Sequence, residues 1–122
     1  MRALLLHNPT AGSGQHSADK LLGHLADAGF DVRYISTDDD DYKAALAESD
    51  AEIVIVAGGD GTVGKIARNI ANRKMRLAIL PIGTANNVAR SLAIKGEIAA
   101  LIANLKDAPE RRLDVGCVSG PW

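Results

Sequence analysis

Four short apolar runs recur along the chain, and each is followed by polar or glycine-containing sequence. The runs cover residues 3–6, 32–35, 53–56 and 77–80. Apolar runs of this length, with turn residues on either side, are typical of strands that are buried on both faces. The pattern therefore predicts four core strands.

The segments between the runs have the spacing of amphipathic helices. Apolar residues recur three to four positions apart before Gly29, after Tyr42 and over residues 63–70, which predicts a helix in each segment. Two more helices are predicted over about residues 86–93 and 96–105. Alternation of strand and helix predicts an α/β fold with a mostly parallel, doubly wound sheet.

Composition and charge narrow the function. The chain has 122 residues and a formal net charge of -1, which fits one domain and gives no general attraction to nucleic acid or to an anionic membrane. We expect no nucleic-acid partner and a function carried by a local site. The single cysteine fits a reducing compartment, and the apolar run at the amino terminus is too short for a signal peptide or a spanning helix. We expect a cytoplasmic protein.

Three loops that follow predicted strands combine glycine with short hydroxyl or amide side chains. They are NPTAGSG at residues 8–14, GGDGT at 58–62 and PIGTANN at 81–87. In open parallel sheets, ligands bind beyond the carboxyl ends of the strands. Glycine can adopt positive φ and lets the backbone approach a ligand closely, and N–H groups at a helix start bind anions. Any one loop could be only a tight turn, but the three together predict a phosphate site.

Asp60 is the carboxylate within these loops. It would repel phosphate oxygens unless Mg²⁺ or a proton intervenes. Mg²⁺ is commonly held by one or two carboxylates together with phosphate oxygens. Alternatively, Asp60 accepts a proton from an attacking hydroxyl, although a loose phosphoryl-transfer transition state asks little of a base. A third interpretation is a helix N-cap. We assign no dedicated metal ligand.

Two other groups of polar residues have simpler interpretations. The acidic run at residues 38–41 is interpreted as a solvated helix cap that complements the helix dipole, rather than as a metal site. His7 lies beside the predicted phosphate site, and we expect a half-buried histidine at a strand end without a chemical role.

The three loops, in this order, resemble the amino-terminal domain of the diacylglycerol kinase catalytic family, which includes bacterial lipid kinases and sphingosine kinases. Thr37 after the second strand, PIGTANNVARSL and the terminal LDVGCVSG complete the resemblance. GGDGT also occurs in NAD kinases, whereas PIGTANNVAR points to lipid kinases. The resemblance implies a three-layer α/β/α sandwich, as in NAD kinases and 6-phosphofructokinases.

The resemblance also implies that ATP, with Mg²⁺, lies across the three loops. Asp60 would belong to the catalytic centre, and Thr37 would lie near the nucleoside. The residues implied to hold the nucleotide are Asn8, Thr37, Gly58, Gly59, Gly61, Thr62, Gly83, Thr84 and Asn86.

Two positions depart from the family's pattern. Family members usually have Asn-Glu where this chain has Gly64 and Lys65, and commonly have a carboxylate where it has Asn87. Lys65 could contact a phosphate or a lipid headgroup, or could project into water, which is the interpretation that we favour.

Family members continue into a β-sandwich domain, and residues 112–122 resemble the strand that crosses toward it. We expect residues 1–111 to form the nucleotide-binding domain. The chain would then be one half of a kinase, either a cut piece or a truncated gene product, and inactive by itself.

Three functional hypotheses follow. The first is an ATP-dependent lipid kinase that transfers the γ-phosphoryl group to the hydroxyl of a diacylglycerol or sphingoid-like lipid. It would contact the inner membrane surface transiently. The second is an NAD kinase-like enzyme. The third is a nucleotide-binding or regulatory module without catalysis, which could form a homo-oligomer through the surface that the second domain would cover.

Overall fold

The computed structural model of the protein describes residues 1–10, 17–39, 41–70, 76–83 and 97–105. The helix predicted near residues 86–93 and the crossing strand at 112–122 lie outside the described residues. The described elements, in chain order, are β1 (Arg2–His7), α1 (Ala18–Asp27), β2 (Asp31–Ser36), α2 (Tyr42–Glu48), β3 (Ile53–Gly58), α3 (Asp60–Ile70), β4 (Arg76–Pro81) and α5 (Ile98–Ala103).

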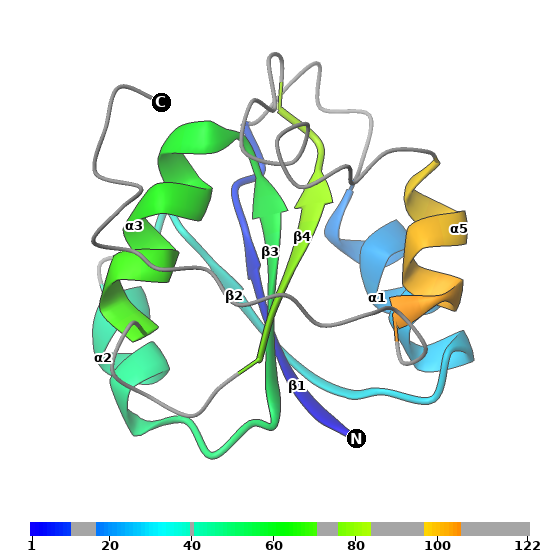
Figure 1. The fold of residues 1–122 in the computed structure, drawn as a ribbon, viewed down its shortest axis with the longest axis horizontal. Coiled ribbons are helices and arrows are strands. Elements are labelled where there is room, and N and C mark those ends of the chain that lie inside the picture. Colours follow the sequence, from blue (N-terminus) through cyan, green and yellow to red (C-terminus); the bar gives the residue numbers. More distant parts are fainter. Residues whose placement is uncertain (11–16, 40, 71–75, 84–96, 106–122) are drawn as a thin grey trace.

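The four strands form one parallel sheet in the order β2-β1-β3-β4. Figure 1 shows α1 and α5 on one face of this sheet and α2 and α3 on the other. The predicted three-layer, doubly wound α/β fold is confirmed, and so are all four predicted strands. A parallel sheet needs crossover connections, and the helices that supply them cover both of its faces.

The two sheet faces have separate hydrophobic cores, because successive side chains of a strand point to opposite faces. In β3, Ile53 and Ile55 pack on the face covered by α1 and α5, whereas Val54 and Val56 pack on the face covered by α2 and α3. All four side chains are buried. This double burial explains why the strands appear in the sequence as continuous apolar runs.

Two helices differ from the prediction in where they begin or end. Helix α3 begins at Asp60, three residues before the start that the apolar spacing indicated. The first buried residue of the helix is Val63, so its first turn carries no apolar signal. Helix α5 covers Ile98–Ala103, a shorter span than the predicted 96–105.

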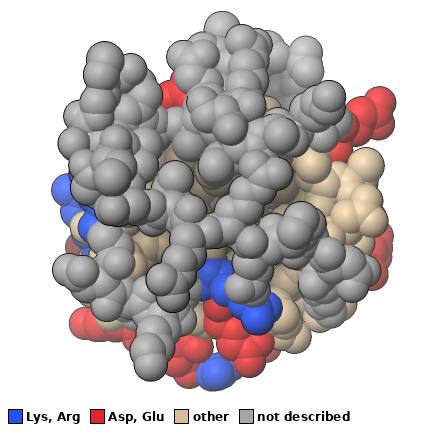
Figure 2. Space-filling view, viewed as in Figure 1, with Lys and Arg blue, Asp and Glu red and all other residues tan. Residues whose placement is uncertain are grey.

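Charged side chains of both signs share the described surface. In the view of Figure 2, red and blue side chains alternate along the lower edge of the molecule. None of the described helices combines the length and the apolar character needed to cross a membrane.

Helix α1 ends in a Schellman motif centred on Gly29. The Gly29 N–H donates to the Ala26 carbonyl at 3.0 Å, and the Phe30 N–H donates to the Leu25 carbonyl at 3.1 Å. Gly29 has a φ of 89°, a left-handed conformation that glycine adopts without a Cβ penalty. Phe30 and Leu25 both belong to the core on this face, so the motif leads the chain directly into β2.

We therefore expect Gly29→Ala to lower the free energy of unfolding by about 1–2 kcal/mol, because alanine is strained in this conformation. Gly23→Ala is the matched control, since Gly23 lies within α1 and an added Cβ would meet no atom within 4 Å. That control should raise stability by up to about 1 kcal/mol. Urea unfolding of both variants measures the effects, and a shift of the same sign in both would contradict the assignment of Gly29.

Candidate functional site

The strands of the sheet end together at one edge. His7 is paired with Ser36 of β2 and with Ala57 of β3, and Gly58 is paired with Pro81 of β4. Because the strands are parallel, the loops that follow them all leave from this carboxyl edge, at the top of the sheet in Figure 1. The structure therefore brings together the described parts of the three predicted loops.

Backbone contacts connect the strand ends to one another. The Thr37 N–H donates to the His7 carbonyl at 2.9 Å, and the Asn8 N–H donates to the Ala57 carbonyl at 2.9 Å. On the other side, a Cβ built on Gly59 would lie 3.5 Å from the Cα of Gly83. The loops after all four strands are thus neighbours along the edge.

The Asn8 side chain joins the first loop to helix α3. Its Oδ1 accepts hydrogen bonds from the Thr10 N–H at 3.1 Å and from the Thr10 hydroxyl at 2.8 Å, which forms an Asx turn. Its Nδ2 donates to Oγ1 of Thr62 at 3.4 Å. Asn8 and Thr62 were both predicted as site residues, and they lie in direct contact.

Gly58 is required by packing rather than by backbone conformation. A Cβ on Gly58 would lie 2.9 Å from the Cβ of Thr62, which is too close. An added Cβ at Gly61 would meet no atom within 4 Å. The capacity of glycine for positive φ is not used at Gly58, Gly59 or Gly61, because among the described residues the glycine with positive φ is Gly29. The absence of a side chain at Gly58 lets Thr62 pack against the end of β3.

The first turn of α3 points its amino end at this edge. The Val63 N–H donates to the Gly59 carbonyl at 3.0 Å, so Gly61 and Thr62 precede the first donor of the helical ladder. Their N–H groups have no acceptor within the helix. Asp60 is the acidic residue of the first turn and is partly exposed. An anion placed here would interact favourably with the helix dipole and with these donors.

A cavity of about 200 Å³ opens beside this turn, on the face of the sheet covered by α2 and α3. Three of the predicted residues line it, namely Asn8, Thr37 and Thr62. Its full lining is Asn8, Thr10, Thr37, Asp38, Tyr42, Thr62, Lys65 and Ile66.

The other predicted residues lie elsewhere. Gly58 is buried at the end of β3. Gly59, Asp60, Gly61 and Gly83 lie at the same edge of the sheet, outside the lining of the cavity. Thr84 and Asn86 lie outside the described residues.

Lys65 and Asp38 are two lining residues that the sequence prediction did not assign to the site. Lys65 is exposed to solvent, as favoured, but it also lines the cavity. Its position three residues after Thr62 on the same helix is the signal that could have revealed this, since such residues share a helix face. Asp38 is also exposed. Asp38 reaches the cavity because α2 and α3 pack on the same face of the sheet. The sequence alone does not predict this packing.

The acidic run differs in part from its predicted role as a helix cap. Asp41 occupies the N-cap position of α2, but its side chain makes no capping hydrogen bond. The backbone N–H of Asp41 donates to Oδ1 of Asp39 at 3.1 Å. The capping interpretation is therefore wrong for the Asp41 carboxylate.

His7 supports the site from the opposite face of the sheet. It is only 1% exposed, so the expectation of a half-buried histidine is wrong. Its Nδ1 lies 2.9 Å from the hydroxyl of Tyr34, a partner on β2 that lets a polar ring be buried at this position. Burial raises the pKa of Tyr34, and the charge of Asp38 adds to the increase, while a hydrogen bond from Ser36 opposes it.

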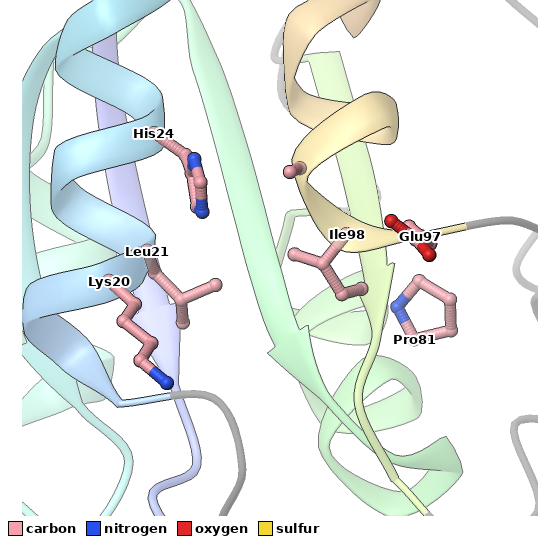
Figure 3. A pocket seen from close by; sticks show the side chains of 7 residues that line it. Lys20, Leu21, His24, Pro81, Glu97 and Ile98 are labelled. Atoms are coloured by element: carbon pink, nitrogen blue, oxygen red, sulfur yellow. The ribbon is translucent and has the colours of Figure 1, made fainter.

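A second cavity, of about 400 Å³, lies between α1 and α5. Figure 3 shows Leu21 and His24 of α1 facing Ile98 and Glu97 across it. Lys20, Ala99 and Pro81 complete its lining. This cavity contains none of the predicted site residues and lies on the other face of the sheet from the Asn8–Thr62 contact.

The structure is an open parallel α/β domain whose candidate site, with polar and glycine residues, lies at the carboxyl edge of the sheet. The chain belongs to the family described as the diacylglycerol kinase catalytic domain, whose model matches residues 2–118.

Relatives and solved structures agree with this assignment. The chain is 31% identical over 123 residues to the diacylglycerol kinase of Staphylococcus epidermidis, covering 94% of this chain and 39% of that protein. It is 35% identical over 122 residues to a Pseudomonas aeruginosa protein named "Probable lipid kinase YegS-like", covering 96% of this chain and 40% of that protein. A crystal structure of a diacylglycerol kinase from Bacillus anthracis superposes with a TM-score of 0.68 at 31% identity, over 87% of this chain and 42% of that one. The chain thus spans about two fifths of the length of these relatives.

The packing at Gly58 generates a prediction about stability. Gly58→Ala should lower the free energy of unfolding by roughly 1–3 kcal/mol, because the added Cβ forces Thr62 and the start of α3 to move. Gly61→Ala should change stability by less than about 1 kcal/mol, since its Cβ enters open space. Denaturant unfolding of the two variants makes the comparison. A Gly58→Ala variant as stable as the wild type would show that the close contact places no constraint on the loop.

Proposed function

We propose that this chain is the nucleotide-binding half of an ATP-dependent lipid kinase, which transfers the γ-phosphoryl group of ATP to a lipid hydroxyl. Membership of the diacylglycerol kinase catalytic domain family supports this proposal. The relatives described above are named as diacylglycerol or lipid kinases, which favours a lipid acceptor over NAD. The acceptor would be a diacylglycerol or a sphingoid-like lipid, met by a cytoplasmic enzyme at the inner membrane surface.

The contact between Asn8 and Thr62 is the observation that carries the proposal. It joins the loop after β1 to the amino end of α3, where N–H groups without helical acceptors favour an anion. The adjoining cavity of about 200 Å³ is lined mainly by hydroxyl, amide and charged side chains. Because complete ligand sites usually measure about 300–1,000 Å³, this cavity would hold one part of the nucleotide.

The residues at this edge also fit ATP together with Mg²⁺. Mg²⁺ is usually held by only one or two protein carboxylates, with phosphate oxygens and water completing its shell. Asp60, in the first turn of α3, offers one such carboxylate. When bound, the ion would neutralise charge on the phosphates. The hydroxyls of Thr62 and Thr37 and the amide of Asn8 would orient the nucleotide.

Asp60 is proposed to lie at the reacting centre. It is partly exposed at the carboxyl edge of the sheet. It could accept the proton of the lipid hydroxyl or stand beside the metal. In both roles its negative charge is needed for transfer, while most of the nucleotide contacts come from other residues.

Asp60→Asn should therefore reduce phosphoryl transfer by roughly 100-fold or more and leave ATP affinity nearly unchanged. The measurement uses a full-length protein that contains this segment, with labelled ATP and diacylglycerol in mixed micelles. Asp19→Asn is the matched control, because Asp19 is also an acidic residue in the first turn of a helix, α1, and removal of its charge should leave turnover intact. An Asp60→Asn enzyme with wild-type turnover would contradict the catalytic assignment.

A further inference from the structure

The cavity beside α3 holds one cation and one carboxylate among the described residues that line it. The cation is Lys65, and the carboxylate is Asp38. In the sheet order β2-β1-β3-β4, Asp38 follows β2, while Lys65 lies on the helix that follows β3. Asp38 and Lys65 therefore reach the cavity from opposite sides of β1, because they follow β2 and β3, two strands that are about 10 Å apart.

The backbone direction of α3 places the Lys65 side chain toward the site. Side chains of a helix lean toward its amino end, and residues three apart share a face. Lys65 follows Thr62 by three positions on α3. Its flexible four-carbon stem therefore extends along the helical turn that contains Thr62, whose hydroxyl accepts the hydrogen bond from Asn8. The Lys65 carbonyl also accepts a hydrogen bond from Nδ2 of Asn69 at 2.8 Å.

No carboxylate in the described part of the chain forms an ion pair with Lys65, although Asp38 lines the same cavity. The described salt bridge of Arg2 with Asp50, at 2.6 Å, lies elsewhere on the sheet. Lys65 is exposed and keeps its charge available to a ligand. An anionic group in the cavity would be attracted to the Lys65 end and repelled from the Asp38 end.

We propose that Lys65 binds a phosphate group of the nucleotide in this cavity, and that Asp38 directs the uncharged, hydroxyl-bearing part of the nucleotide to the opposite end. This inference rests on the proposed function and adds to it two residues, one that recognises phosphate and one that favours a single orientation of the nucleotide. A carboxylate accepts hydrogen bonds from hydroxyl donors, whereas an ammonium group pairs with phosphate.

The test is a calorimetric titration of the 122-residue chain with Mg-ATP, inorganic tripolyphosphate and adenosine. Lys65→Gln should weaken ATP and tripolyphosphate binding by roughly tenfold, as expected for loss of a charge-assisted hydrogen bond. Adenosine binding should stay unchanged. Lys65→Arg should restore ATP affinity to within about threefold, because it retains the charge. Lys43→Gln is the matched control, since Lys43 is exposed on the neighbouring α2 and does not line the cavity.

Asp38→Asn tests the orientation with the same ligands. Tripolyphosphate binding should tighten by about twofold to threefold, because a repelling charge is removed, while adenosine binding should weaken. The opposite pair of changes would overturn the orientation.

The outcomes separate the inference from the proposed function. If the wild-type chain binds ATP and Lys65→Gln binds it equally well, the role of Lys65 is overturned while the proposed function stands. If Lys65→Gln weakens adenosine as much as ATP, the residue acts on the nucleoside or on the fold, and phosphate recognition is overturned. A folded wild-type chain that binds neither ATP nor tripolyphosphate would overturn both.

Discussion

The parallel pairing of β1 with both of its neighbours is the constraint on which the site depends. His7 at the end of β1 is opposite Ser36 and Ala57, so the loops after β2, β1 and β3 start at the same level. Because side chains alternate between faces, a slip of one residue would exchange the faces of every side chain in the strand. Asn8 would then turn away from Thr62, and the cavity would lose its connection to α3. The apolar residues buried on both faces make such a slip costly.

The same pairing gives the carboxyl edge two parts with different surroundings. On the face of α2 and α3, Asn8 and Thr62 form a polar contact that borders a cavity. On the opposite face, His7 and Tyr34 form a buried polar pair one residue away. A buried pair of this kind holds the strand end in place, whereas the first contact lies where a ligand can reach it. The buried pair and the more accessible contact thus lie on opposite faces of the sheet, both at the end of β1.

Much of the fold follows from the sequence because its apolar pattern is a local property. Buried parallel strands and amphipathic helices have periods that a short window reveals, and the loops at their ends were recognised from glycine and short polar residues. What the pattern could not provide were facts of tertiary packing. Gly58 is needed because Thr62 lies against it, and His7 is buried because Tyr34 offers a partner from another strand. Lys65 and Asp38 likewise line the cavity only because of the way α2 and α3 pack on the sheet.

The most direct measurement is a nuclear magnetic resonance titration of the isotope-labelled chain with Mg-ATP. The account predicts saturable shifts of the backbone amide signals of Asn8, Gly61 and Thr62, which lie at the carboxyl edge of the sheet. Amides at the opposite edge, such as that of Glu52, should stay unchanged. Shifts that cluster around His24 and Ile98 instead would place the nucleotide in the cavity between α1 and α5 and contradict the account. The absence of any saturable shift in the folded chain would contradict it as well.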